Sequence, residues 1–188
     1  EASRQELLRT RASQVRAVVT AGHVGCPADL VRSLPNLGAI AINGVGLDKV
    51  DLALLLQRGI ALGTTPNTLA EDVADLAVGL TIALLREIPA NDAHVRAGLW
   101  PRAERPLGRK VTGRRFGILG LGQIGLAIAQ RLTPFGPVAW SGPREKAVAW
   151  SYHSAVLSLA RASDVLVVAC PANAATRHLV DSKVIEAL

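Results

Sequence analysis

Residues 116–130, FGILGLGQIGLAIAQ, constrain the fold of this chain more than any other stretch. A short apolar run, Phe116–Leu119, comes first, and a segment with the character of a helix, Gln123–Leu132, follows. Three glycines stand here in the spacing G-x-G-x-x-G, at Gly120, Gly122 and Gly125. The spacing alone is weak evidence in a chain with 17 glycines. A strand, a glycine turn and a helix in this order, however, are typical of a loop that binds the pyrophosphate of a dinucleotide.

Each glycine has a separate task in such a loop. Gly120 permits the tight turn, Gly122 lets the backbone approach a pyrophosphate, and Gly125 lets the helix pack closely on the strand. The N–H groups and the dipole at the start of the helix favour a phosphate there. The alternative is a glycine-rich turn without a ligand. The predicted phosphate-binding residues are Gly120, Leu121, Gly122, Gln123, Ile124 and Gly125.

The residues after the next predicted strand bear on which dinucleotide binds. A site for NAD usually has Asp or Glu about 20 residues after the first glycine, where the carboxylate holds the ribose 2′-hydroxyl. This chain has the sequence SGPREK there, with Ser141 at its start and Arg144 within it. A carboxylate would repel the 2′-phosphate of NADP, whereas an arginine attracts it. The sequence therefore favours NADP(H) over NAD(H), unless Arg144 merely faces solvent.

Short apolar segments alternate with helical segments along the whole chain. This alternation indicates parallel sheets covered by helices, which is an α/β fold. The longest helix is expected over residues 69–87, with a Thr68–Glu71 capping box at its start, and Pro89 ends or kinks it. Its mostly apolar faces are typical of a helix that joins two domains or packs on a partner subunit. Strands are expected at 15–20, 37–42, 60–63, 116–119, 138–140 and 164–169, and shorter helices at 27–34, 50–58, 123–132, 155–161 and after Asp181.

Composition and charge argue against several classes of partner. Aromatic residues make up only 3% of the chain, which leaves few stacking platforms for single-stranded nucleic acid. The net charge of the chain is +6, and six of its basic residues lie in residues 102–115. We interpret this segment as a solvated connector. The longest apolar run, residues 73–85, is interrupted by Asp75 and is too short to span a bilayer. We therefore expect neither nucleic acid nor a membrane as partner.

Cys26 and Cys170 form neither a metal-binding spacing nor a disulfide framework. Such cysteine usage is typical of a reducing compartment. We therefore expect a cytoplasmic protein without a bound metal.

Four segments together resemble the D-isomer-specific 2-hydroxyacid dehydrogenases. NGVGLDKVDL (43–52) resembles the substrate loop of that family, and TTPNTLAEDVADLAVGLTIALLR (64–86) is similar to its long hinge and dimer helix. GILGLGQIG (117–125) resembles its nucleotide loop, and SDVLVVACPANAATRHLVD (163–181) resembles the strand and loop beneath the nicotinamide ribose. Within the family, the VVACP sequence and the Ser-x-x-Arg spacing look most like the NADPH-dependent hydroxypyruvate/glyoxylate reductases.

The resemblance implies a flavodoxin-like substrate domain over residues 1–98, including the long helix, followed by the first half of a Rossmann doubly wound cofactor domain over residues 99–188. It also implies a homodimer formed through the long helix. Residues implied to bind the substrate are Asn43, Val45 and Gly46. Further residues implied to line the cofactor are Cys170, Pro171 and Thr176, besides Ser141 and Arg144.

The chain departs from the family pattern in its catalytic residues. The family uses an arginine to orient the keto acid and a His–Glu pair to supply a proton, and none of these is matched here. His23, His94, His153 and His178 stand outside the catalytic context of the family. We expect the arginine, glutamate and histidine beyond Leu188, and a chain that is inactive alone.

The function implied is the reduction of a small 2-keto acid, such as glyoxylate or hydroxypyruvate, by NAD(P)H. Two alternatives remain open at this point. One is a cofactor-sensing, protein-binding relative of the corepressor type, and the other is a phosphoglycerate, formate or lactate dehydrogenase of the same family.

Overall fold

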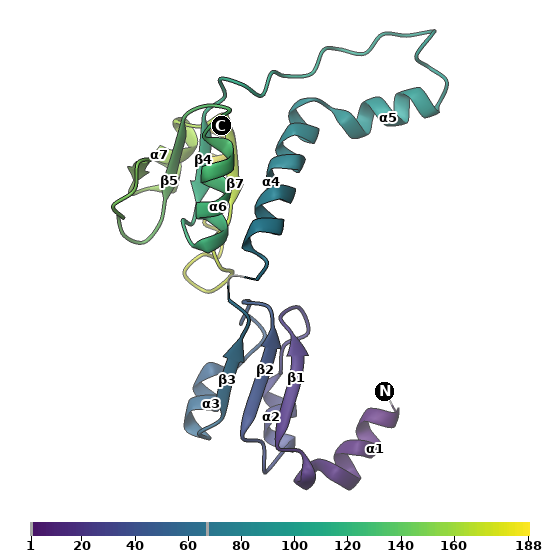
Figure 1. Cartoon of the computed structure of the whole chain (residues 1–188), viewed down its shortest axis with the longest axis vertical. Helices are drawn as coiled ribbons and strands as arrows, with labels where there is room; N and C mark the ends of the chain where they lie inside the picture. The colour runs from purple at the N-terminus through teal and green to yellow at the C-terminus, as the bar shows by residue number, and fades with distance from the viewer. Residues whose placement is uncertain (1, 67) are drawn as a thin grey trace. The chain divides into compact units, whose positions relative to one another are not determined.

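The computed structural model describes residues 2–66 and 68–188. The chain separates into two compact units, residues 1–69 and residues 70–188 (Figure 1). Each unit has its own parallel sheet and its own hydrophobic core. The α/β fold that the sequence predicts is therefore confirmed.

The first unit contains a three-stranded parallel sheet in the order β1-β2-β3. Its strands are β1 (Ala17–Ala21), β2 (Ala39–Asn43) and β3 (Ala61–Thr64). Its helices are α1 (Ala2–Arg11), the short 3-10 helix η1 (Ala12–Gln14), α2 (Ala28–Ser33) and α3 (Leu52–Gln57). Each predicted element of this unit exists, and α1 and η1 were not predicted.

Helices cover one face of the sheet of the first unit. Ile40 and Ile42 are buried against Val31 of α2 and Leu55 of α3. The connections from β1 to β2 through α2 and from β2 to β3 through α3 run in the same direction across the sheet. Because such connections are right-handed, both helices lie on the same face. On the opposite face the side chain of Val19 is 82% exposed. A flavodoxin-like fold has helices on both faces, so that part of the fold prediction stays a prediction.

The second unit contains a four-stranded parallel sheet in the order β6-β5-β4-β7. The first strand in the chain, β4 (Phe116–Leu119), lies inside the sheet and all its residues are buried. The chain moves outward to β5 and β6, then crosses to β7 on the other side of β4, as in the first half of a doubly wound Rossmann sheet. The other elements are β5 (Val138–Ser141), β6 (Ser151–His153), β7 (Val165–Val168), α6 (Gln123–Leu132), α7 (Val156–Arg161) and α8 (Ser182–Glu186).

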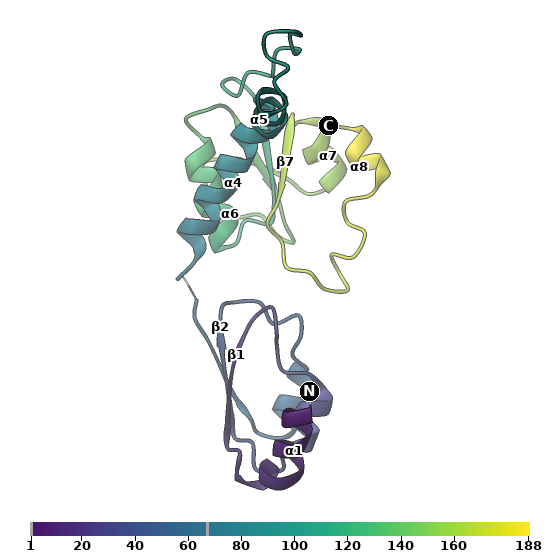
Figure 2. The ribbon, with the colours of Figure 1, turned by 90° about the vertical axis from the view of Figure 1, so that its right-hand side faces the viewer.

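Helices cover both faces of this second sheet. Figure 2 shows α4 (Ala70–Leu85) and α6 on one face, and α7 and α8 on the other. Buried side chains of α6, among them Ile128 and Leu132, pack with Phe116 and Ile118 of β4. On the opposite side, a Cβ added at Gly117 would lie 2.3 Å from the hydroxyl of Ser163, so the glycine allows close packing there.

The strand of this unit that was not predicted is β6. It is a short edge strand that lacks an apolar run.

The long helix that the sequence predicts is two helices, α4 (Ala70–Leu85) and α5 (Ile88–Arg96). Glu87 between them has the left-handed backbone conformation, with φ of 52°, and a proline stands in the first turn of α5. The break near Pro89 is therefore confirmed, whereas the expected end at residue 87 is slightly late. Contacts group α4 with the second unit, because it packs along α6. The domain boundary between residues 98 and 99 stays a prediction.

An ion-pair network fastens α4 to α6. The guanidinium of Arg131 on α6 donates to Asp75 at 2.5 Å and also binds Glu71, both on α4. The hydrogen bonds that Arg131 donates to Glu71 and Asp75 raise its pKa. The capping box expected at Thr68 and Glu71 is wrong, because the Thr68 hydroxyl donates to the carbonyl of Thr65 at 3.0 Å and Glu71 binds Arg131.

Asp164 joins the beginnings of β4 and β7. Its carboxylate accepts the backbone N–H of Arg115 at 2.8 Å and the guanidinium of Arg115 at 2.7 Å. These hydrogen bonds hold the pKa of the Asp164 carboxyl below its ordinary value. The pair lies just before both strands, at the end of the sheet opposite to the glycine loop.

Candidate dinucleotide-binding site

The glycine loop follows β4 and packs against the end of β7. Gly120 has a φ of 95°, and a Cβ there would lie 2.7 Å from the backbone nitrogen of Cys170. A Cβ at Gly125 would lie 2.0 Å from the carbonyl oxygen of Gly120. A Cβ at Gly122 would meet nothing within 4 Å. Gly120 and Gly125 are therefore required by packing, whereas Gly122 leaves space that a ligand can use.

The beginning of α6 supplies unpaired donors beside that space. Gly122 is the N-cap residue, and no side chain caps the helix there. The first N–H groups of an α-helix lack partners within the helix and carry the positive end of its dipole. The backbone at Gln123 and Ile124 can therefore donate to a phosphate.

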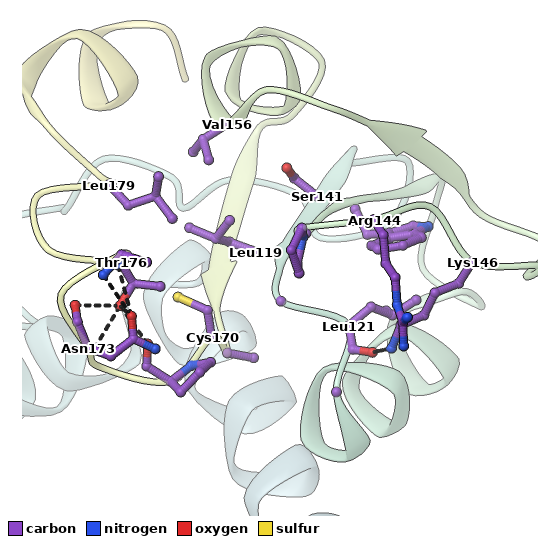
Figure 3. A pocket seen from close by; sticks show the side chains of 18 of the residues that line it. Leu119, Leu121, Ser141, Arg144, Lys146, Val156, Cys170, Asn173, Thr176 and Leu179 are labelled. Carbon is purple, nitrogen blue, oxygen red and sulfur yellow. Dashed lines mark hydrogen bonds between the residues drawn. The ribbon is translucent and has the colours of Figure 1, made fainter. Parts of the chain in front are cut away.

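A cavity of about 580 Å³ opens at the carboxyl ends of β4, β5 and β7 (Figure 3). The strand order reverses between β5 and β7 on the two sides of β4, which is where doubly wound sheets bind their ligands. Its size is within the range of small-molecule and cofactor sites. The lining residues include Leu119, Gly120, Leu121, Gly122, Ser141, Arg144, Lys146, Val156, Cys170, Pro171, Asn173, Thr176 and Leu179.

The residues after β5 form one wall of the cavity. Ser141 is only 3% exposed, and its carbonyl accepts the N–H of Gly120 at 2.8 Å. Arg144 lines the cavity from the loop that follows (Figure 3). Neither aspartate nor glutamate is among the described residues that line it. This wall therefore suits an anionic ligand group.

The loop after β7 is held in shape by its own side chains. The Thr176 hydroxyl donates to the carbonyl of Pro171 at 2.7 Å and accepts the N–H of Asn173 at 2.9 Å. The side-chain oxygen of Asn173 accepts the N–H groups of Ala175 at 2.9 Å and Thr176 at 3.2 Å. Thr176 therefore has a structural task in addition to any contact with a cofactor. Sequence reasoning missed Asn173, although asparagine favours turns because its side chain bonds the backbone two residues on.

Most of the predicted cofactor residues meet at this one cavity. Those that line it are Gly120, Leu121, Gly122, Ser141, Arg144, Cys170, Pro171 and Thr176. Gln123, Ile124 and Gly125 do not line it: Gly125 is buried against the loop, and the other two begin α6. The roles of all these residues in binding stay predictions. Val156 and Leu179 were missed because they are ordinary apolar residues that only the fold brings to the cavity.

The first unit has a separate group of loops at the carboxyl ends of its strands. The N–H of Gly44 donates to the Thr65 hydroxyl at 2.8 Å, and the N–H of Thr65 donates to the carbonyl of Gly44 at 3.1 Å. These bonds fix the loop that carries Asn43, Val45 and Gly46. Within residues 2–66 and 68–188, the N–H groups of Val45 and Gly46 have no hydrogen-bond partner. They are therefore able to donate to a carboxylate.

The histidines take no part in the cavity. The ring of His94 contacts the carbonyl of Ala103 at 2.8 Å, and that of His153 contacts the Ser158 hydroxyl at 2.8 Å. His23 and His178 do not line the cavity either. Among the described residues, no group of three or more His, Cys, Asp or Glu could hold a metal ion.

The strand order, the glycine loop and the cavity at the switch point define the class: this is a dinucleotide-binding α/β protein. Residues 78–188 match the family model described as D-isomer specific 2-hydroxyacid dehydrogenase, NAD binding domain. The chain therefore belongs to the D-isomer specific 2-hydroxyacid dehydrogenases, which are oxidoreductases.

Several relatives are similar to the whole chain. Glyoxylate/hydroxypyruvate reductase A of Arabidopsis thaliana is 46% identical over 97% of this chain and 59% of its own length. Hydroxyphenylpyruvate reductase of Plectranthus scutellarioides is 41% identical over 99% of this chain and 60% of its own length. The NADPH-dependent glyoxylate/hydroxypyruvate reductase of Sinorhizobium meliloti, solved with NADP and malonate, has a TM-score of 0.88 and 35% identity over 95% of this chain and 56% of its own.

The chain thus spans about three fifths of the length of these relatives. In the part that the structure describes, no helix is long and apolar enough to cross a membrane.

Proposed function

We propose that the full-length protein reduces a small 2-keto acid, of the glyoxylate or hydroxypyruvate type, to the D-2-hydroxy acid with NADPH as the preferred hydride donor. The observation that carries the proposal is the wall of the cavity after β5. It has a buried serine, Ser141, and a cation, Arg144, where a carboxylate for the ribose 2′-hydroxyl would stand in an NAD site. The reductase names of the relatives support the substrate class.

The residues at the cavity fit such a cofactor. The space at Gly122 and the donors at the beginning of α6 suit the pyrophosphate. Ser141 and Arg144 would hold the 2′-phosphate. The backbone at Cys170 and Pro171, shaped by Thr176, would lie along the cofactor. When bound, the nicotinamide supplies a hydride for the keto carbon.

The loop after β2 would bind the substrate carboxylate. The free N–H groups of Val45 and Gly46 can donate to its two oxygens, as backbone donors do in other anion sites. The reciprocal bonds between Gly44 and Thr65 would hold these donors in place before the substrate arrives. The arginine that orients the keto group and the histidine that gives the proton would belong to a part of the full-length protein outside residues 1–188.

The assembly proposed is a cytoplasmic homodimer formed through α4. Three leucines of α4 are largely exposed in this chain: Leu76 at 61%, Leu80 at 60% and Leu84 at 72%. They recur at helical spacing and form one apolar stripe. A stripe of this kind on a helix whose other side packs on the second unit supports an interface with a second copy.

The test uses the full-length protein, glyoxylate or hydroxypyruvate, and both reduced cofactors. We expect turnover with kcat/KM for NADPH at least about tenfold above that for NADH, since a lost charge-assisted contact costs about that factor. Equal values, or a preference for NADH, would contradict the cofactor assignment. Binding of NADPH without any turnover would instead favour the protein-binding, corepressor-like alternative.

A further inference from the structure

Lys146 bridges two parts of the cofactor cavity. The ammonium of Lys146 donates to the carbonyl oxygen of Leu121 at 2.6 Å. Leu121 stands between Gly120 and Gly122 in the glycine loop, and Lys146 comes from the segment between β5 and β6. Both residues line the cavity, and Figure 3 shows the lysine reaching toward Leu121. The contact therefore fixes the ammonium at the border between the glycine loop and the wall after β5.

The charge of Lys146 is not neutralised by this contact. A carbonyl oxygen is a neutral acceptor, and an ammonium has three donors, so two donors remain free for a ligand. Within the part of the chain that the structure describes, Lys146 and Arg144 form no ion pair with a carboxylate. Glu145, between them, is exposed and does not line the cavity. Two unpaired cations thus belong to one wall of one cavity.

We propose that Lys146 is a second ligand of the ribose 2′-phosphate and therefore determines cofactor specificity together with Arg144. This rests on the proposed function, in which the cavity binds NADPH. A phosphate monoester carries up to two negative charges, which two cations match better than one. Because the contact with Leu121 already restricts the lysine, little rotamer entropy is lost when the phosphate binds. Lys146 also couples the phosphate position to the shape of the glycine loop.

The experiment measures dissociation constants of NADPH, NADH, 2′,5′-ADP and 5′-ADP for the full-length protein. The variants are Lys146→Met and, as a matched control, Lys183→Met, which removes an exposed lysine of α8 outside the cavity. We expect Lys146→Met to weaken NADPH and 2′,5′-ADP roughly tenfold or more, because a charge-assisted contact is lost. NADH and 5′-ADP should change less than about threefold, and Lys183→Met should change none of the four constants.

The ratio of the affinities separates specificity from loop structure. If Lys146→Met weakens all four ligands equally, the lysine acts only on the glycine loop, and this proposal is overturned. If the wild-type protein prefers NADPH and Lys146→Met keeps that preference, this proposal alone fails. If the wild-type protein binds NADPH and NADH equally, both the proposed cofactor preference and the proposed role of Lys146 fail. Melting curves of each variant verify that the protein remains folded.

Discussion

Gly122 and Gly125 stand three residues apart in the same loop, yet the structure gives them different tasks. A Cβ at Gly125 would overlap the carbonyl oxygen of Gly120, whereas a Cβ at Gly122 would point into open space. The G-x-G-x-x-G spacing indicates that all three glycines matter, but it does not distinguish a packing requirement from space for a ligand. The conformation of the loop makes that distinction.

The two glycines should therefore respond differently to the same substitution. Gly125→Ala forces the loop and α6 apart, and we expect it to lower the free energy of unfolding by roughly 1–3 kcal/mol. Gly122→Ala should leave stability within about 0.5 kcal/mol, because nothing is displaced in the unbound protein. It should still weaken NADPH binding, since the methyl group would occupy the space of the pyrophosphate.

Urea unfolding and NADPH titration of both full-length variants measure these effects. Similar losses of stability in Gly122→Ala and Gly125→Ala would contradict the distinction.

At the scale of elements, alternation of apolar and helical segments predicted all but four of the strands and helices of the described residues. The elements that were missed are α1, the 3-10 helix η1 that directly follows it, α5 and β6. None has a strong local signal: α1 is polar, β6 is a three-residue edge strand, and α5 continues an existing helical pattern. At the break, Glu87 has a left-handed backbone conformation, and glutamate is not a residue from which that conformation can be predicted. Weak local preferences of this kind are decided by packing.

The pairing of β4 with β7 carries a pH dependence through Asp164. Its pKa is lowered in the folded protein by Arg115. The resulting stabilisation is fully present above the ordinary carboxyl pKa of about 4 and is lost as the pH falls through the lowered value. We expect Asp164→Asn to unfold at lower urea concentration than the wild type at pH 7. The difference should shrink as the pH decreases below about 4, where the wild-type carboxyl becomes protonated.

Urea midpoints between pH 7 and pH 3 test this expectation, and Asp29→Asn, an exposed acid of α2 without an ion pair among the described residues, is the matched control. If the difference in urea midpoint between the wild type and Asp164→Asn stays constant over this range, the charge of the carboxylate contributes nothing to stability.

At the scale of the whole molecule, the apolar stripe of α4 bears on assembly. The stripe consists of Leu76, Leu80 and Leu84, which the second unit leaves exposed. If the proposed dimer forms through it, Leu80→Glu combined with Leu84→Glu places buried charges in the interface. We expect the dimer dissociation constant to rise about 100-fold or more. Sedimentation of the full-length protein over a range of concentrations measures the change.

Leu56→Glu is the matched control, because Leu56 of α3 is 84% exposed and belongs to the first unit. It should leave the assembly unchanged. An unaltered dimer in the double variant would remove α4 from the interface.

The sequence by itself determined the α/β class, the glycine loop and the position of the helix that follows this loop. Each of these depends on local chemistry within a few residues. From their distance along the chain, the sequence also predicted that Ser141 and Arg144 lie near the glycine loop, and both line the cavity beside it. Only the tertiary structure decided that Asn173, Val156, Leu179 and Lys146 belong to the same cavity. These residues come from separate segments of the chain, and their own identities do not show that they meet at one cavity. Parallel strands bring their carboxyl ends together across distant parts of the chain, which is a property of the sheet rather than of any segment.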